Sequence, residues 1–200
     1  ISIMSDSDLK QLNFPQTISD SSIKGIILVE ICDKVVCDAL SQFNLPIVSV
    51  DMPNVPFEEL NGIDVVTMES KKNLKKIINQ LIEKGAESFG FVGDLYSPNV
   101  SRGFQERYNA LSECLAEHQL PLNQKNCLLH QTPEDFRNFQ TTVNNLQAMI
   151  SLPDVFICGN DWTAIQLIYA LQFLGFQIPK DICVVGFDNI PAASRISPSL

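Results

Sequence analysis

Two pairs of polar residues follow apolar runs in the last third of this 200-residue chain. Asn160 and Asp161 come directly after the run Val155 to Cys158, and Asp188 and Asn189 come shortly after the next such run. In an open parallel sheet, small ligands bind in the crevice outside the carboxyl ends of the strands. If both runs are neighbouring parallel strands, the sequence predicts a ligand site at these polar residues.

Asp188 is the strongest candidate for a ligand contact. A carboxylate at the end of a strand can accept two short hydrogen bonds from vicinal sugar hydroxyls, or one from the N–H of a base. The alternative is that Asp188 caps the helix or turn that follows it. Asn160 and Asp161 begin a predicted helix, so we expect one of them to be its N-cap and the other to face the ligand.

The sequence contains no pattern typical of a catalytic, cofactor or metal site. No G-x-G-x-x-G follows a strand, and neither a phosphate-binding G-x-x-x-x-G-K-[ST] loop nor a G-x-S-x-G elbow occurs. His118 and His130 are the only histidines and lack zinc-site spacing, and the six cysteines form no C-x-x-C pair. We therefore expect no enzymatic activity, no metal and no cofactor, and free cysteines in a reducing, cytoplasmic compartment.

The charge balance excludes several partners. With 14 Lys and Arg against 23 Asp and Glu, the net charge is −9, and phosphate contacts need clustered basic residues. The one basic cluster, Lys71, Lys72, Lys75 and Lys76, has the spacing of a solvated helix face. No apolar run approaches the ~20 residues of a membrane span, and the amino terminus lacks the pattern of a signal peptide. We expect this segment to contact neither nucleic acid nor a membrane by itself.

The elements that position these residues alternate in type, which is typical of βαβ units in a parallel sheet. Helical spacing marks a helix that ends at Gly85, and further helices are expected over about 100–117, 133–150 and 161–174. The predicted strands are Gly25 to Val29, Pro46 to Val50, Val65 to Met68, Ser88 to Val92, Cys127 to Leu129, Val155 to Cys158 and Ile182 to Val185. The fold class predicted from this alternation is α/β.

Several segments together resemble the effector-binding domain of the LacI/GalR family of bacterial transcription regulators. They are "VVGFDN" followed by "SPSL", "GND", "IKGIILVE", "LPIVSVDMP", "LIEKGAESFGFVGD" and "SRGFQERYNALSECL". The resemblance implies a two-lobed fold of the periplasmic-binding-protein type with a ligand in the cleft, a first lobe over 1–85 and a second over 86–200. It also implies that a strand and helix before "ISIM" and a return after "SPSL" are missing, so that the domain is truncated at both ends.

The resemblance adds three ligand-contact candidates and favours Asn160 over Asp161. Arg102 matches an arginine that can clamp hydroxyls, carboxylate or phosphate, and its alternative is a surface pair with Glu106. Glu69 stands where many members carry Asp, and its alternative is an acid that stabilises a helix amino terminus. Phe136 is the nearest substitute for the aromatic residue of sugar-binding members, and its alternative is a place in the core.

The implied function is that of a homodimeric repressor domain that binds a small effector, such as a sugar. Operator DNA would be bound only through an amino-terminal helix-turn-helix that is absent from this chain. The alternative is a solute-binding protein of a sugar transporter, which has the same fold. Within the stretch after Asp188, Ile190, Ile196 and Leu200 are predicted to lie at the subunit interface, or else to fold back on their own lobe.

Overall fold

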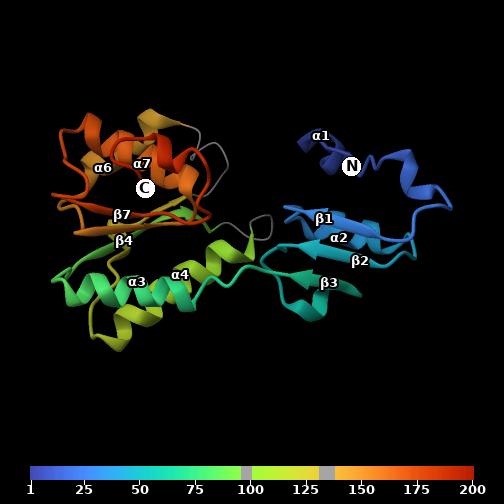
Figure 1. The fold of residues 1–200 in the computed structure, drawn as a ribbon, viewed down its shortest axis with the longest axis horizontal. Helices are drawn as coiled ribbons and strands as arrows, with labels where there is room; N and C mark the ends of the chain where they lie inside the picture. Colours follow the sequence, from blue (N-terminus) through green and yellow to red (C-terminus); the bar gives the residue numbers. More distant parts are fainter. Residues whose placement is uncertain (96–100, 131–137) are drawn as a thin grey trace. The chain divides into compact units, whose positions relative to one another are not determined.

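The computed structural model describes residues 1–95, 101–130 and 138–200, and the chain divides into two compact units. Of the described residues, unit 1 holds 1–68 and 101–103, and unit 2 holds 69–95, 104–130 and 138–200. Each unit is a parallel sheet with helices packed on it (Figure 1). This confirms the expected α/β architecture of parallel sheets flanked by helices.

Unit 1 contains three parallel strands in the order β1-β2-β3. The helix between the first two strands begins where the Asp33 carboxylate accepts the Val35 N–H at 2.8 Å. Its apolar side, with Val36 and Leu40, packs on Leu28 in the core of the unit. The bounds of the elements are α1 Asp6–Gln11, β1 Ile26–Val29, α2 Lys34–Ser41, β2 Ile47–Val50 and β3 Ile63–Val66, with short 3-10 helices at Gln16–Ser19 and Phe57–Leu60.

One face of this sheet is open among the described residues. Side chains alternate between the two faces of a strand, so Leu28 is buried on the α2 side while Ile27 and Val29 are 73% and 62% exposed. Val50 and Val66 stand in the same row as Val29 and are also exposed. Unit 1 therefore has a single covered sheet face.

Unit 2 contains four parallel strands in the order β5-β4-β6-β7, with α3 and α4 on one face and α6 and α7 on the other (Figure 1). Because both faces are covered, β6 is buried along its whole length and reads as a continuous apolar run. The bounds are α3 Lys72–Glu83, β4 Phe89–Asp94, α4 Arg102–Glu117, β5 Leu128–His130, α6 Phe139–Ala148, β6 Val155–Cys158, α7 Asp161–Phe173 and β7 Cys183–Val185.

The division of the chain differs from the expected lobes 1–85 and 86–200. The helix α3 groups with unit 2, because Leu74 and Ile78 share a core cluster with Phe89 and Leu111. The unit boundary in the structure therefore falls before α3, at Met68 and Glu69.

Several elements differ by one or two residues in extent from the predictions, and β3 and α6 show the local reasons. The strand β3 begins two residues earlier than expected, because Asn61 and Gly62 adopt positive φ values of 40° and 80° and turn the chain directly into Ile63. The helix α6 is described from Phe139, where the side-chain oxygen of Asn138 accepts the Thr141 N–H. Residues 131–137 of the expected helix lie outside the described part of the chain.

The basic cluster at the start of α3 lies on a helix surface, as predicted, but part of it is ion-paired. Lys71 and Lys75 lie 3.1 and 3.0 Å from the carboxylate of Glu113, and Lys75 lies 2.9 Å from that of Glu117. The cluster therefore ties α3 to α4, and exposed pairs of this kind contribute at most about 1 kcal/mol each.

Candidate functional site

Glycines at the carboxyl ends of β6 and β7 allow close approach of side chains in unit 2. A Cβ atom on Gly159 would lie 2.3 Å from the ring of Phe104, and one on Gly186 would lie 2.2 Å from the Asp161 carboxylate. Only glycine fits these positions without a shift of the neighbouring groups. The strand ends are therefore tightly joined to the first turns of α4 and α7.

Asn160 and Asp161 divide their roles in a way that the sequence did not predict. Asn160 is the N-cap of α7, where its side-chain oxygen accepts the Thr163 N–H at 2.9 Å. Asp161 is 97% buried, with 3% exposed. Its carboxylate accepts the Ile190 N–H at 2.8 Å, and its own N–H donates to the carbonyl of Phe187 at 2.8 Å. Asn160 rather than Asp161 therefore caps α7, so the expectation that Asp161 is the cap is wrong.

Ligand contact by Asn160 stays a prediction. The cap engages only the oxygen of its amide, so the two N–H bonds of Nδ2 are left for other acceptors. The residue is half-buried at the end of β6. An amide donor at this place suits a hydroxyl or carbonyl oxygen of a small molecule.

Asp188 lies on the loop that Asp161 holds from both sides. It is exposed, and its φ of 101° is followed by a φ of 54° at Asn189. Residues other than glycine rarely adopt a positive φ. Strained backbone of this kind is found most often at ligand sites. The loop therefore presents the Asp188 side chain from a fixed backbone, and its contact with a ligand stays a prediction.

Sequence reasoning missed Arg107, a buried cation next to this loop. Arg107 is only 5% exposed. Its Cζ atom lies 4.1 Å from the ring centroid of Phe187 and 5.1 Å from that of Phe104. Its Nη1 donates to the hydroxyl of Ser70 at 3.3 Å. The guanidinium thus positions the residue before Asp188 through a cation–π contact.

A signal for Arg107 was present in the sequence. Phe104, Tyr108 and Leu111 follow one another at helical spacing in the expected helix over about 100–117, and Arg107 lies three residues after Phe104 and four before Leu111. Residues with this spacing share one face of a helix. A lone arginine on an apolar helix face is therefore a candidate for a buried, positioned cation.

Arg102 lies at the start of α4 and belongs to unit 1, where it contacts other residues of that unit. Its Nη1 donates to the carbonyl of Val55 at 3.0 Å, and its Cζ atom lies 4.5 Å from the ring centroid of Phe57. Its backbone N–H donates to the carbonyl of Met52. These contacts fix its guanidinium, and its predicted contact with a ligand is untested.

The Glu69 carboxylate binds the backbone at the start of α3. It accepts the N–H groups of Lys71 and Lys72 at 3.0 and 2.6 Å, and that of Asn73 at 3.2 Å. These hydrogen bonds, that of Lys72 first, hold the pKa of Glu69 below its ordinary value. The helix role that was its alternative is thus observed, while ligand contact stays untested. Phe136 lies outside the described residues.

Unit 1 has its own polar cluster at the end of β2. Asp51 has a φ of 70°, and its carboxylate accepts the Ser101 hydroxyl at 2.5 Å and the Met52 N–H at 2.7 Å. Burial first, and then the charge of Asp51, raises the pKa of the Cys32 thiol to about 12. A thiol with such a pKa stays protonated at neutral pH and is a poor nucleophile.

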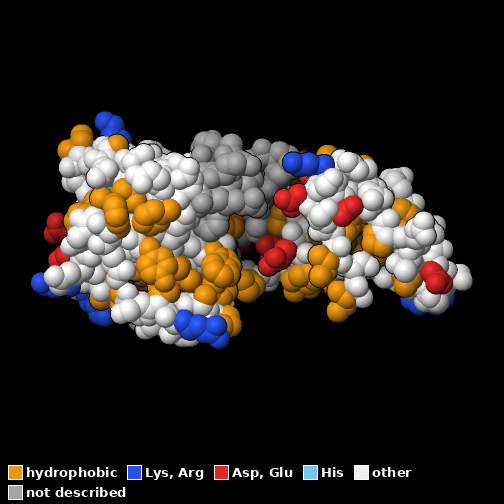
Figure 2. Space-filling view, turned by 90° about the horizontal axis from the view of Figure 1, so that it is seen from above, with side chains coloured by type: hydrophobic (Ala, Val, Ile, Leu, Met, Phe, Trp, Pro, Cys, Tyr) orange, Lys and Arg blue, Asp and Glu red, His pale blue; other side chains and the backbone are white. Residues whose placement is uncertain are grey.

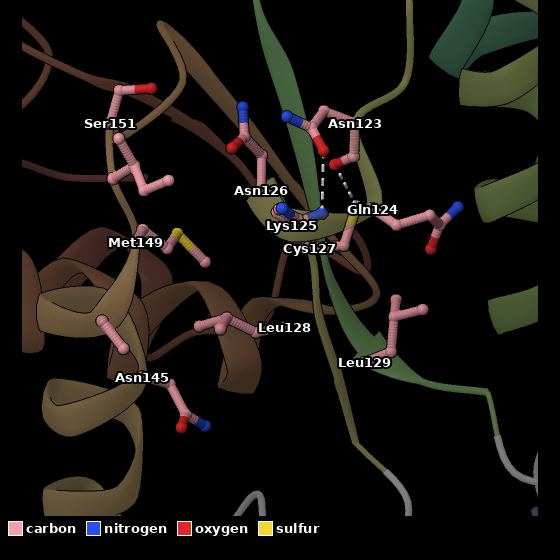
Figure 3. A pocket seen from close by; sticks show the side chains of 12 residues that line it. Asn123, Gln124, Lys125, Asn126, Cys127, Leu128, Leu129, Asn145, Met149 and Ser151 are labelled. Carbon is pink, nitrogen blue, oxygen red and sulfur yellow. Dashed lines mark hydrogen bonds between the residues drawn. The ribbon is translucent and has the colours of Figure 1, made fainter.

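A cavity of about 790 Å³ lies elsewhere in unit 2 (Figure 3). It opens beside the start of β5 and is lined by residues of 123–129 together with Asn145, Met149 and Ser151. None of the predicted ligand contacts lines it. This cavity is therefore separate from the candidate site. The evidence for the candidate site is the set of fixed polar groups at the ends of β6 and β7.

The described residues lack two further kinds of feature. They contain no cluster of three or more His, Cys, Asp or Glu side chains that could hold a metal ion. They also contain no helix with the length and apolar character needed to cross a membrane.

The parallel strands and their polar carboxyl ends define an α/β ligand-binding domain. Residues 78–200 match the family described as periplasmic binding protein-like domain. The chain belongs to this family, and its resemblance to the effector-binding domains of LacI/GalR regulators is confirmed by its relatives.

Curated relatives are transcription regulators. Catabolite control protein A of Staphylococcus xylosus is 30% identical over 207 aligned residues, which cover 100% of this chain and 58% of that protein. The ribose operon repressor of Haemophilus influenzae is 26% identical, over 92% of this chain and 53% of that protein. The chain thus spans between half and three fifths of the length of these two relatives.

Solved structures share the fold. A putative LacI transcriptional regulator from Bacillus cereus subsp. cytotoxis matches with a TM-score of 0.76 and 22% identity, over 92% of this chain and 63% of that one. A CelR–cellobiose complex matches with a TM-score of 0.75 and 17% identity, over 98% of this chain and 57% of that one. A LacI family regulator from Lactobacillus casei with bound sucrose matches with a TM-score of 0.69 and 21% identity, over 97% and 67%.

Proposed function

We propose that this chain is the effector-binding domain of a LacI-type transcription regulator, a repressor, and that its effector is a sugar or a similar polyhydroxylated molecule. The observation that carries the proposal is the loop after β7, which carries Asp188 and Asn189 on backbone with positive φ and is hydrogen-bonded to Asp161, the residue after the N-cap Asn160. The carboxylate accepts hydrogen bonds from hydroxyls, and the amide of Asn160 donates them. Neighbouring structures with bound cellobiose and sucrose support this ligand class.

The proposal extends to the whole protein. Operator DNA is bound through a helix-turn-helix domain outside these 200 residues, the protein is a homodimer in the cytoplasm, and it is no enzyme. The relatives that are transcription regulators support this part of the proposal. For the effector to act on DNA binding, it must bind one state of the protein better than another, typically by about 1–3 kcal/mol of coupling.

A solute-binding protein of a sugar transporter is the alternative with the same fold. The six cysteines favour the regulator, because all of them are free thiols. Proteins exported to oxidising compartments usually convert such thiols into disulfides. The curated relatives named above are regulators as well.

A ligand screen with matched variants tests the effector site. The wild-type chain is screened by thermal shift against sugars, sugar phosphates and nucleobases, and affinities of hits are measured by calorimetry. Asp188→Ala is expected to weaken binding of a hit at least tenfold, since hydrogen bonds to a charged group contribute about 1.5–3 kcal/mol. Glu87→Ala removes an exposed carboxylate at the start of β4, at the opposite end of the strands, and should leave affinity unchanged.

The outcomes test the location of the site and the class of ligand separately. If Asp188→Ala binds a sugar as tightly as the wild type, the assignment of the site to the end of β7 is wrong. If no sugar or sugar derivative in the screen stabilises the wild type while a nucleobase does, the proposed ligand class is wrong.

A further inference from the structure

The cavity of about 790 Å³ in unit 2 lies at the end of the sheet opposite to the candidate effector site. It is lined by the short 3-10 helix Gln124–Asn126, by the start of β5, and by the last turn of α6 with the segment after it. The candidates Asn160 and Asp188 follow the carboxyl ends of β6 and β7, whereas the cavity meets the parallel strand β5 at its amino end. Cavities that bind small molecules have volumes of about 300–1,000 Å³. The cavity therefore has the size of a second ligand site.

Several polar side chains of the lining make no hydrogen bond with the described residues. The backbone N–H of Asn126 donates to the carbonyl of Asn123 at 2.9 Å, but the half-buried side-chain amide of Asn126 has no partner there. The same holds for the amide of Asn145 and the hydroxyl of Ser151. Polar groups that are taken out of bulk water and lack a protein partner are normally satisfied by water or by a ligand.

The lining carries a single formal charge, which is positive. Lys125 is exposed, and none of the described lining residues is an aspartate or a glutamate. The ion pairs of the described residues engage Lys34, Lys71 and Lys75 but not Lys125. Burial raises the pKa of the Cys127 thiol, so this neighbour adds no negative charge at neutral pH. The charge of the cavity thus favours an anion over a cation.

The surroundings of the cavity leave this positive charge in place. The helix α6, whose last turn lines the cavity, contains no charged residue. Figure 2, which looks onto α6 and α7, shows charged side chains mainly at the edges of unit 2. Asp154 and Asp181 line an adjoining cavity that shares Ile150, and their carboxylates accept backbone N–H groups. The surroundings of Lys125 are therefore a place where a chain of net charge −9 can hold an anion.

Part of the lining is apolar and aliphatic. Leu128 of β5 and Met149 after α6 extend toward each other across the cavity (Figure 3). Leu128 is buried and Met149 is half-buried, so both offer a fixed surface to the carbon chain of a ligand. None of the described lining residues is aromatic, and nucleobases are usually held by stacking on aromatic rings. The lining therefore suits an aliphatic molecule.

The single lysine favours a ligand with one negative charge. A phosphate monoester carries about −1.5 to −2 charges at neutral pH, whereas a carboxylate carries one. The ammonium group of lysine is a point charge on a flexible four-carbon stem, so it can follow a small carboxylate within the cavity. Side-chain amides both donate and accept hydrogen bonds, as hydroxyl groups do.

We propose that this cavity binds a small hydroxylated carboxylate, such as a sugar acid. The ammonium of Lys125 pairs with the carboxylate, and the amides of Asn126 and Asn145 bind the hydroxyl groups. The proposal does not depend on the sugar effector of the proposed function, because none of the effector candidates lines this cavity. It gives the chain a second small-molecule site at the amino end of the sheet.

Calorimetry of the 200-residue chain with three matched ligands tests the proposal. Gluconate is the probe, and sorbitol is its neutral counterpart, since it carries a hydroxymethyl group in place of the carboxylate. Sorbitol 6-phosphate places a phosphate on the same carbon chain. Gluconate is expected to bind at one site, and both sorbitol and its phosphate should bind at least tenfold more weakly.

Variants of the lining test where gluconate binds. Lys125→Met removes the charge but keeps an unbranched side chain, and it should weaken gluconate at least tenfold, as the loss of a charge-assisted pair does. Asn126→Asp keeps the shape of the side chain and adds a carboxylate, so it should abolish binding. Lys180→Met is the matched control, since Lys180 is exposed and lies outside the lining. Asp188→Ala should leave gluconate affinity unchanged.

A second measurement guards against misfolded variants. Thermal unfolding of each variant should match that of the wild type. In ¹⁵N–¹H spectra, the side-chain amide signal of Asn126 is identified by its absence from Asn126→Asp. This signal should shift on addition of gluconate to the wild type and stay in place in Lys125→Met.

Each other outcome overturns the proposal. It is wrong if gluconate does not bind, if sorbitol or its phosphate binds as tightly, or if Lys180→Met weakens gluconate as much as Lys125→Met does. It is also wrong if Asp188→Ala abolishes gluconate binding, since gluconate then occupies the effector site. A sugar screen without hits would contradict the proposed function and leave this site standing, and the reverse result would leave the proposed function standing.

Discussion

At the scale of single residues, two aspartates at the ends of neighbouring strands perform different tasks. Asp161 is buried, and its carboxylate and N–H hold the loop after β7 at Ile190 and Phe187. Asp188 is exposed on that loop, with its backbone in the left-handed region. The first carboxylate therefore maintains the shape of the loop, and the second lies on the exposed surface of that loop.

The strained backbone of Asp188 leads to a prediction that separates recognition from stability. Left-handed backbone costs side chains other than glycine about 1–2 kcal/mol, and glycine adopts it readily. Asp188→Gly is therefore expected to raise the free energy of unfolding by up to about 1 kcal/mol while it weakens effector binding at least tenfold. Urea denaturation and calorimetry on the same samples measure both effects.

The control for this variant is Asp188→Ala, which removes the carboxylate but keeps the strained conformation. It should lose binding without the gain in stability. Should Asp188→Gly bind the effector normally, the carboxylate has no role in recognition. A less stable glycine variant would show that the side chain supports the loop.

At the scale of elements, Asp154 joins the starts of two strands in unit 2. Its carboxylate accepts the N–H groups of Glu87 and Ser88 at 2.9 and 2.8 Å and the hydroxyl of Ser88 at 2.8 Å. Its own N–H donates to the Ser88 hydroxyl at 2.9 Å. Residues 66 positions apart are thereby held in the register in which β4 pairs with β6.

The same hydrogen bonds predict how the stability of the protein depends on acid. Partial burial acts to raise the pKa of Asp154, but the hydrogen bonds from Glu87 and Ser88 outweigh it and hold the pKa below its ordinary value. Since the folded-state pKa is the lower one, the stabilisation is complete above the unfolded-state pKa of about 4 and is lost as the pH falls through the folded value.

Asp154→Ala is therefore expected to lower the free energy of unfolding at neutral pH by about 1–2 kcal/mol, a reduced figure because the residue is exposed. At acid pH the difference from the wild type should shrink, since the wild-type carboxylate takes up a proton as the pH falls through its folded-state pKa. Urea denaturation at both pH values measures this, with Glu87→Ala as the control that keeps its backbone N–H. A difference that grows in acid would contradict the assignment.

At the scale of the whole molecule, charge is distributed unevenly over the chain. The net charge is −9, yet α6 and α7 together carry only the buried Asp161, while lysines gather at the start of α3. Two of those lysines are paired with acids of α4. The helices α6 and α7 are therefore an uncharged part of unit 2, and the ion pairs leave little positive charge for a polyanion.

The last prediction concerns DNA. The 200-residue chain is expected not to bind duplex DNA even at low ionic strength, where contacts of lysine and arginine with phosphate are strongest. A gel shift at about 20 mM salt, repeated at higher salt, is sufficient to check this. A complex that dissociates as salt is raised would reveal a basic surface. It would contradict the proposal that operator DNA is bound only through a domain outside these 200 residues.

The sequence by itself determined the elements and the class of fold. Apolar runs such as Val155 to Cys158 mark buried strands, and glycines such as Gly85 and Gly175, with φ values of 99° and 93°, mark helix ends. These features depend on local backbone preferences and on the periodicity of burial, which are readable within about ten residues. The same locality placed Asn160 and Asp188 at the ends of β6 and β7.

Only the tertiary structure decided which polar side chain does what. Asp161 is buried because its partner Ile190 lies 29 residues later in the chain, and Arg107 is buried because Phe187 covers it from beyond β7. The helix α3 belongs to unit 2 because Ile78 meets the core of that unit. Each outcome depends on contacts between segments far apart in the sequence. The local spacing of residues does not determine which distant group packs against a given side chain.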